Sequence, residues 1–289
     1  IFILLLFFLL KVPSISLQAS VLLRTLTAQS IDTASAPDIR WLGFSYIAFR
    51  LLHTIRDRQT GRLPAVSLAE YVTFLVFFPT LSAGPIDRLE RFTTDLRTAP
   101  NRTPEEIGEA GKRLLIGLFK KFAVADTLAL IALNATNATQ TSSTGWLWVM
   151  LYAYALRIYF DFSGYSDIAI GLGKLAGFSI PENFDRPYLK TNLTTFWNSW
   201  HITLALWLRA YWFNPLSRAL RTKAKALPAW AMIGISQLTT MILLGLWHGV
   251  SWNFVIWGTW HGIGLFIHNR WANATRTWDK SLNTRPRLR

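Results

Sequence analysis

Residues 229–247 read AWAMIGISQLTTMILLGLW, a run that contains no charged residue. A bilayer core needs about 20 apolar residues per helix, so this run predicts a membrane-spanning helix. Further apolar stretches lie at 1–10, 41–53, 68–84, 112–133, 145–178, 193–216 and 252–268. Short polar blocks separate them. The pattern predicts an all-α, polytopic transmembrane helical bundle with broken or re-entrant helices.

The composition supports a membrane protein. Hydrophobic residues make up 51% of the chain and charged residues 16%, whereas soluble domains carry about a quarter charged residues. The net charge of +14 would suggest nucleic acid in a soluble protein. Here, however, the basic residues flank apolar runs, as the positive-inside bias predicts. We therefore expect a lipid bilayer and no nucleic acid as partner, while attraction for an anionic donor or polymer stays open.

The organisation is expected to be simple. One transmembrane domain is predicted over residues 1–270, with a basic polar tail over 271–289. The opening IFILLLFFLL lacks the basic start and cleavage site of a signal peptide, so it is interpreted as the end of a truncated helix. Because the chain has no cysteine, any thioester in its chemistry would arrive on a partner.

His248 directly follows the run at 229–247 and stands between Trp247 and Gly249. An imidazole kept from water stays neutral, and a neutral imidazole can accept a proton from a hydroxyl near pH 7. A structural histidine that binds a neighbouring helix fits the position equally well. The position alone does not separate a catalytic role from a structural one.

The segment FWNSWH at 196–201 is a second candidate. On a continuous helix, Trp197, Trp200 and His201 share one face. An interfacial aromatic belt explains the tryptophans but needs no imidazole. Trp257 and His261 extend this aromatic lining, with a structural role expected for His261. No carboxylate cluster accompanies the histidines, so we expect no metal.

Asp161 and Asp167 lie in the otherwise apolar segment 159–167. Buried carboxylates need charged or hydrogen-bonding partners, which favours a structural polar network over direct catalysis. Candidate partners are Arg157, Arg186 and Arg209.

In this collinear order, the motifs resemble the membrane-bound O-acyltransferase family, in its bacterial branch of alginate O-acetylation and teichoic-acid D-alanylation proteins. The matching segments are 43–46, 77–80, 83–86, 117–121, 159–167, 181–184, 196–204 and 245–249. The chain departs from the branch where Ala210 replaces the usual acid after Arg209.

The resemblance implies a catalytic His248 and a second polar position at His201, which orients or polarises a substrate. It also implies a central tunnel through the bundle. The side chains expected to bind substrate there are Trp197, Trp200, Asn198 and Trp247.

The reaction so implied is acyl transfer to a hydroxyl in the bacterial inner membrane, with acetyl moved onto a cell-envelope polysaccharide. D-alanyl transfer to teichoic acid from a carrier-protein thioester is the alternative. The acyl donor, a thioester or an acylated carrier, is expected from the cytoplasmic side as a co-substrate, without a tightly bound cofactor. Extracytoplasmic acyltransferase or polysaccharide machinery is the further partner. A transporter or a non-catalytic assembly subunit is the alternative of another class, because intramembrane His and Asp also mark ion paths.

Overall fold

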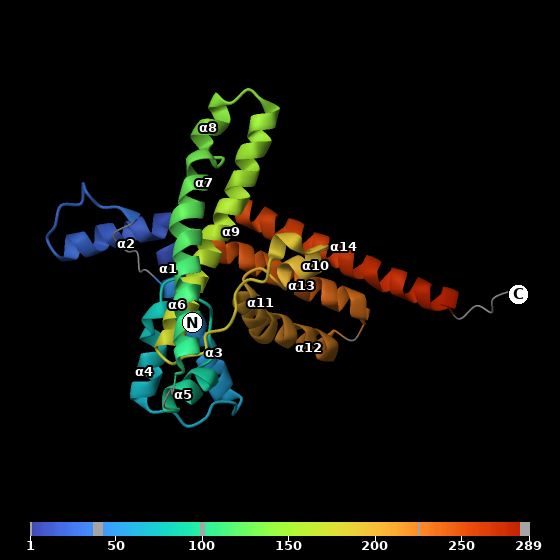
Figure 1. Ribbon diagram of the computed structural model, residues 1–289, viewed down its shortest axis with the longest axis horizontal. Coiled ribbons are helices and arrows are strands. Elements are labelled where there is room, and N and C mark those ends of the chain that lie inside the picture. Colours follow the sequence, from blue (N-terminus) through green and yellow to red (C-terminus); the bar gives the residue numbers. More distant parts are fainter. Residues whose placement is uncertain (1, 37–42, 99–101, 225, 284–289) are drawn as a thin grey trace, which may run out of the picture. The chain divides into compact units, whose positions relative to one another are not determined.

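The computed structural model describes residues 2–36, 43–98, 102–224 and 226–283, and the regular elements among them are all helices. The all-α prediction is therefore confirmed. The chain divides into two compact units, one formed by 1–41 with 186–289 and the other by 42–185 (Figure 1).

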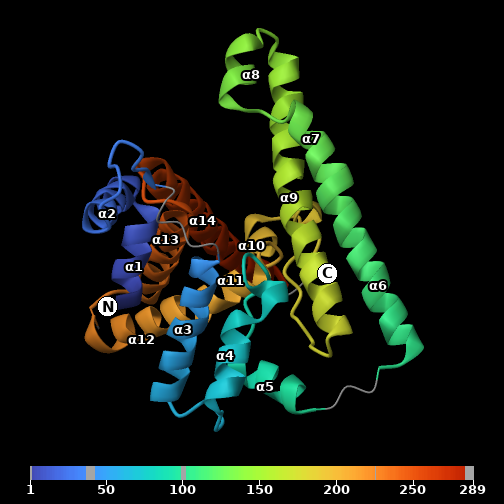
Figure 2. The same ribbon diagram turned by 90° about the vertical axis from the view of Figure 1, so that its left-hand side faces the viewer.

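The unit 42–185 contains a long helical hairpin. Its first arm is α6 (Pro104–Leu118), the π-helix η3 (Phe119–Ala125) and α7 (Asp126–Ile131), which follow one another without a break. The second arm is α9 (Thr144–Leu175), which lies beside the first in both views (Figure 2). The short α8 (Ala135–Gln140) belongs to the connection between the arms.

The two arms touch backbone to backbone. A Cβ atom on Gly117 would clash with the backbone of α9 at Gly164, and one on Gly164 would clash with the backbone of the first arm. Most of the apolar stretch 145–178 lies in one long helix. α9 is unbroken because the stretch contains no proline and its glycines serve helix contact.

Three shorter helices complete this unit: α3 (Phe44–Gln59), α4 (Leu68–Val76) and α5 (Leu89–Arg97). The apolar run at 68–84 does not form one long helix. It turns into the short 3₁₀-helix η2 (Phe78–Thr80), because Pro79 cannot continue the α-helical hydrogen-bond ladder.

Arg50 of α3 stabilises this early helix end. Its side chain is 1% exposed and donates to the carbonyl oxygens of Phe74 at 2.8 Å, Leu75 at 2.9 Å and Thr80 at 2.9 Å. Carbonyls at the end of a helix have no partner within the helix. The guanidinium therefore supplies the donors that the terminated α4 lacks.

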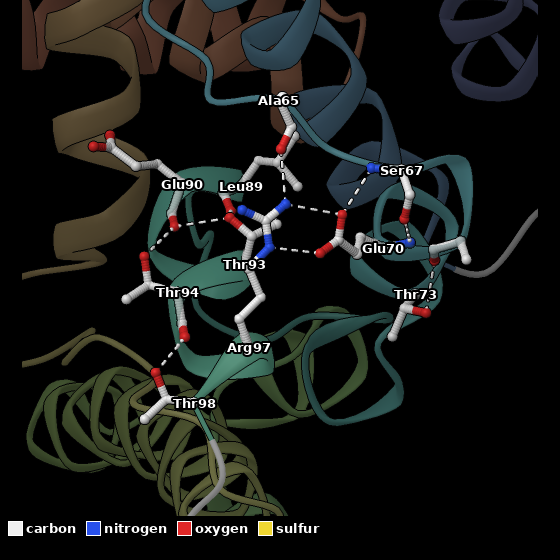
Figure 3. A network of polar contacts seen from close by, with 11 residues as sticks. Ala65, Ser67, Glu70, Thr73, Leu89, Glu90, Thr93, Thr94, Arg97 and Thr98 are labelled. Carbon is white, nitrogen blue, oxygen red and sulfur yellow. Dashed lines mark hydrogen bonds and ion pairs between the residues drawn. The ribbon is translucent and has the colours of Figure 1, made fainter.

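A second arginine ties α4 to α5 (Figure 3). Arg97 donates to both carboxylate oxygens of Glu70, at 2.7 and 3.0 Å, and to the carbonyl oxygen of Ala65 at 2.7 Å. Glu70 also accepts from the backbone N–H of Ser67, whose hydroxyl caps α4 in return. One carboxylate thus joins a helix cap to an interhelical ion pair.

The other unit is built around two antiparallel helices, α13 (Ala229–His248) and α14 (Trp252–Asn283), which lie side by side in Figures 1 and 2. The predicted helix over 229–247 is confirmed. α14 continues through position 271, where the sequence analysis places the start of a polar tail.

Among the described residues, α13 is the single helix that by itself is long and apolar enough to cross a membrane. The segments Leu5–Lys11 of α1 (Phe2–Lys11) and Pro13–Leu26, which is α2, meet the same test as a pair bent by 95°. The described helices therefore offer one span, or two if the bent pair counts as one.

The apolar stretch 193–216 does not form one continuous helix. It forms successive elements that are interrupted at 198–201. In chain order, the elements from residue 187 are η4 (Pro187–Leu189), α10 (Leu193–Trp197), α11 (Ile202–Leu208), the π-helix η5 (Arg209–Phe213) and α12 (Asn214–Lys223).

Candidate functional site

His201 and His248 lie on two sides of one indole ring. The ring centroid of Trp247 is 6.0 Å from that of His201 and 4.7 Å from that of His248. The structure therefore brings the two sequence-predicted histidines into one site, although they are far apart in the chain. Trp247, predicted as a substrate-binding residue, is the side chain between them.

The backbone at His201 explains why the helix is interrupted there. His201 has φ 46° and ψ 54°, in the left-handed region, and precedes the first residue of α11. This conformation costs a non-glycine residue about 1–2 kcal/mol. The predicted shared helix face of Trp197, Trp200 and His201 is wrong, because the chain turns between them. The side chain of His201 is nevertheless buried, with 5% exposure.

His248 is fixed by its position at the end of α13 and by two rings of α14. Phe254 stacks on it at 5.8 Å, and Trp257 meets it edge to face at 5.5 Å. His248 as a residue is exposed in the described part of the chain. The sequence predicts an imidazole kept from water, whereas the described part of the chain leaves this ring accessible beyond the end of its helix.

Trp257 continues the aromatic wall away from His248. Its ring lies 5.8 Å from Trp197 and 4.7 Å from His261, and Trp197 lies 5.2 Å from His261. Trp197 is thus joined to His248 through Trp257. Trp200 packs elsewhere, against Tyr188 and Phe196 at 5.8 Å each.

Sequence reasoning missed Lys11. Its ammonium lies 5.9 Å from the ring centroids of Phe7 and Trp247, which places a cation beside the histidine pair. The sequence signal for Lys11 is its position as a single charge at the end of the apolar run 1–10. The contact with Trp247 joins opposite ends of the chain and cannot be read from spacing.

Asp161 and Asp167 belong to a polar network within the unit 42–185. Asp167 accepts from Arg113 Nε and Lys120 Nζ, both at 2.6 Å. Asp161 binds Lys121. The two lysines lie on the π-helix η3, which packs against α9. The network is structural in its geometry, since it joins the two arms of the hairpin.

The partners predicted for these carboxylates are wrong. The sequence favours Arg157, Arg186 and Arg209 as partners, but the described ion pairs of the two acids use the basic residues of the neighbouring helical arm. Arg209 instead donates to Oδ1 of Asn198 at 3.0 Å. It therefore belongs with the candidate substrate-binding residues rather than with the acids.

A cavity of about 290 Å³ adjoins this part of the site. Trp197 lies in its wall, but neither His201 nor His248 does. The polar lining comprises Thr194, Asn198, Arg209, Gln237, Thr240 and Asn269. The apolar lining includes Leu208, Phe213, Ile233, Met241, Leu244 and Leu265. The candidate site therefore has two parts, a histidine pair and a separate cavity behind the aromatic wall.

The chemistry available at the histidine pair is proton transfer and hydrogen bonding. An accessible imidazole can accept a proton from a hydroxyl, and a buried one can hold a carbonyl or hydroxyl in place. Among the described residues, no group of three or more His, Cys, Asp or Glu is placed to hold a metal ion.

A family model described as MBOAT, membrane-bound O-acyltransferase family, matches residues 2–286. The chain is 32% identical to the teichoic acid D-alanyltransferase of Streptococcus thermophilus, over 84% of this chain and 60% of that protein. It is 39% identical to the probable alginate O-acetylase AlgI of Azotobacter vinelandii, over 78% of this chain and 44% of that protein.

A third relative carries another name. The peptidoglycan O-acetyltransferase of Helicobacter pylori is 35% identical over 72% of this chain and 38% of that protein. Across these three relatives, the matched part of the chain spans between 38% and 60% of their lengths.

Proposed function

Because the chain belongs to the membrane-bound O-acyltransferase family, we propose that the protein transfers an acyl group to a hydroxyl, with His248 as the proton acceptor. The observation that carries this proposal is the pairing of His248 with His201 across Trp247. In the reaction, the acceptor oxygen attacks the acyl carbonyl while His248 takes its proton, and the donor leaves with a proton returned from the imidazole.

The geometry suits His248 to this role. Its ring is oriented by Phe254 and Trp257 on one side and is exposed on the other. A general base must lie within hydrogen-bond reach of the proton that it abstracts. An oriented ring with an open face meets that requirement for an incoming hydroxyl.

His201 is suited to a different task. Its side chain is buried and held by a strained backbone, so it is preorganised. A preorganised donor can stabilise the charge that develops on the carbonyl oxygen in the transition state. We assign His201 to orienting or polarising the acyl group, with Trp247 beside it as a substrate-binding side chain. Trp197, Trp200 and Asn198 are proposed to contact more distant parts of the substrate.

For the substrate, we propose acetyl transfer to a cell-envelope polysaccharide. The relatives named alginate O-acetylase are 37–39% identical to this chain, and those named teichoic acid D-alanyltransferase are 31–32% identical. This difference supports acetyl as the acyl group. D-alanyl transfer from a carrier-protein thioester is the second candidate, supported by the greater coverage of the Streptococcus thermophilus relative.

The surroundings of the reaction follow from the same proposal. The protein would be a multi-pass protein of the bacterial inner membrane with a central tunnel. The acyl donor would enter from the cytoplasm as a co-substrate, and extracytoplasmic polysaccharide machinery would present the acceptor. The uncharged helix α13 and the family's membrane-bound nature support this location.

The test is His248→Ala in the full-length protein, expressed in a strain that lacks its own copy. Polysaccharide acylation should fall to background while the amount of protein in the membrane stays unchanged. His268→Gln is the matched control. His268 lies farther along α14, where its ring is hydrogen-bonded to Thr194 of α10, and it takes no part in the proposed reaction. Full acylation by His248→Ala would exclude the catalytic role and favour a scaffold or transporter.

A further inference from the structure

The cavity behind the aromatic wall is rich in unused hydrogen-bond donors. The indole N–H of Trp197 is buried and has no partner among the described residues. No described hydrogen bond is donated by the side-chain amide nitrogens of Asn198 and Gln237. Arg209 donates to Asn198 alone, so most N–H groups of its guanidinium are also unused.

The amide oxygens around the same cavity are already occupied. Oδ1 of Asn198 accepts from Arg209 at 3.0 Å, Oε1 of Gln237 accepts from Asn269 at 3.4 Å, and Oδ1 of Asn269 accepts from Thr194 at 3.1 Å. Arg209 and Asn198 are exposed and Gln237 is half-buried, so their remaining N–H groups can be reached from the cavity side. Acceptors for these N–H groups would have to come from outside the chain.

The charge of the cavity lining also favours a guest that brings acceptors. No acidic residue occurs in the sequence between Asp185 and Asp279, and the cavity lining contains no carboxylate. The guanidinium of Arg209 consequently has no counter-ion at the cavity. Arg209 and Phe213 both line it from the π-helix η5, a helical distortion that occurs frequently at functional sites.

We propose that this cavity binds a carboxylate carried on a short apolar chain. A planar guanidinium matches the two oxygens of a carboxylate, and the amide N–H groups supply further donors. The apolar part of the lining would receive the chain. A volume of about 290 Å³ lies at the lower limit of small-molecule pockets, which favours a small guest over a lipid.

Neither histidine lines the cavity, but Trp197 and Asn198, assigned above to substrate binding, do, so the proposal is tested by ligand binding and not by acyl transfer. A carboxylate bound there would lie beside Trp197, whose ring contacts Trp257, which in turn contacts His248. The site is therefore expected to bind its guest whether or not the histidine pair is active.

The test is calorimetric titration of the purified, detergent-solubilised full-length protein with sodium hexanoate. Hexanol serves as the neutral analogue and sodium chloride as the salt control. Hexanoate should bind, and hexanol should bind at least tenfold more weakly because it cannot pair with the guanidinium. Equal binding of hexanoate and hexanol, or no binding of hexanoate, would overturn the proposal without reference to any variant. Binding of inorganic phosphate in place of hexanoate would overturn the choice of a carboxylate.

Two variants locate the site. Arg209→Gln removes the positive charge. Gln237→Glu replaces an amide donor by a carboxylate, which repels the carboxylate of hexanoate. Each variant should weaken hexanoate binding about ten- to hundredfold. Gln140→Glu makes the same chemical change at an exposed position in the other unit and should bind as the unaltered protein does. His248→Ala should retain hexanoate binding, which separates this site from the proposed reaction. Unaltered affinity in folded Arg209→Gln and Gln237→Glu proteins would place the carboxylate elsewhere.

Discussion

The rings of His248 and Trp257 meet edge to face, with centroids 5.5 Å apart and planes at 86°. The two residues come from consecutive helices of one hairpin, so the orientation of the proposed base depends on how α14 presents its indole. Aromatic contacts of this kind contribute about 0.5–1.5 kcal/mol beyond the burial of area. The arrangement makes Trp257 a positioning residue for His248.

Trp257→Ala should therefore lower kcat for acyl transfer by about three- to tenfold through loss of ring orientation, with little change in the KM for the donor. Trp257→Phe keeps an aromatic ring and should recover most of the rate. Both rates can be measured with purified protein and a labelled donor. If Trp257→Ala changes KM alone, the indole contacts substrate and does not orient the histidine.

The left-handed backbone at His201 gives a prediction about stability. Glycine adopts this conformation without strain, so His201→Gly should be more stable than His201→Ala by about 1 kcal/mol. Both variants lack the imidazole and should be equally impaired in transfer. Unfolding midpoints and rates measured on the same preparations test the two parts separately. A more stable alanine variant would show that the backbone relaxes at this position.

The two carboxylates of α9 should differ in importance. The side chain of Asp167 is 7% exposed and binds two cations, so Asp167→Asn should destabilise the protein by about 2–3 kcal/mol. This figure is below that of a fully buried pair because Arg113 and Lys120 are partly solvated. Asp161 is 48% exposed, and Asp161→Asn should cost less than about 1 kcal/mol. Equilibrium unfolding of the two variants provides the comparison, and equal costs would contradict it.

The tie between α4 and α5 should persist into strong acid. Hydrogen bonds from Arg97 and from the backbone of Ser67 lower the pKa of Glu70 from 4.5 to about 2. The folded state therefore favours the charged carboxylate of Glu70. The stabilisation of the folded state by this pair is complete above pH 4.5 and is lost as the pH falls toward 2. The difference in unfolding midpoint between the unaltered protein and Glu70→Gln should be constant above pH 4.5 and should disappear near pH 2. A difference that disappears at about pH 4 would show that the pair is not formed in solution.

The sequence predicted the features that depend on local composition. The limits of α13 follow from an uninterrupted apolar run, and the two histidines stand out because imidazoles are rare in such surroundings. The end of α4 could also be predicted from the sequence, because Pro79 interrupts the apolar run at 68–84.

Other features depend on contacts between distant parts of the chain. No glycine or proline lies at the break at His201. The sequence alone therefore gives no sign that the helix is interrupted there. The lysines that bind Asp161 and Asp167 were visible at 120–121, but only helix packing selects them over the nearby arginines. Lys11 reaches Trp247 through tertiary structure alone.

Gly245 and Gly258 face each other's helices in the hairpin of α13 and α14. A side chain on Gly245 would strike the carbonyl oxygen of Phe254, and one on Gly258 would strike that of Met241. Main chains this close cannot slide past one another by a turn without a collision, so their register is locked. A change of shape beside His248 would therefore come from rotation of single rings or from elements outside this pair, while the two helices keep their relative register.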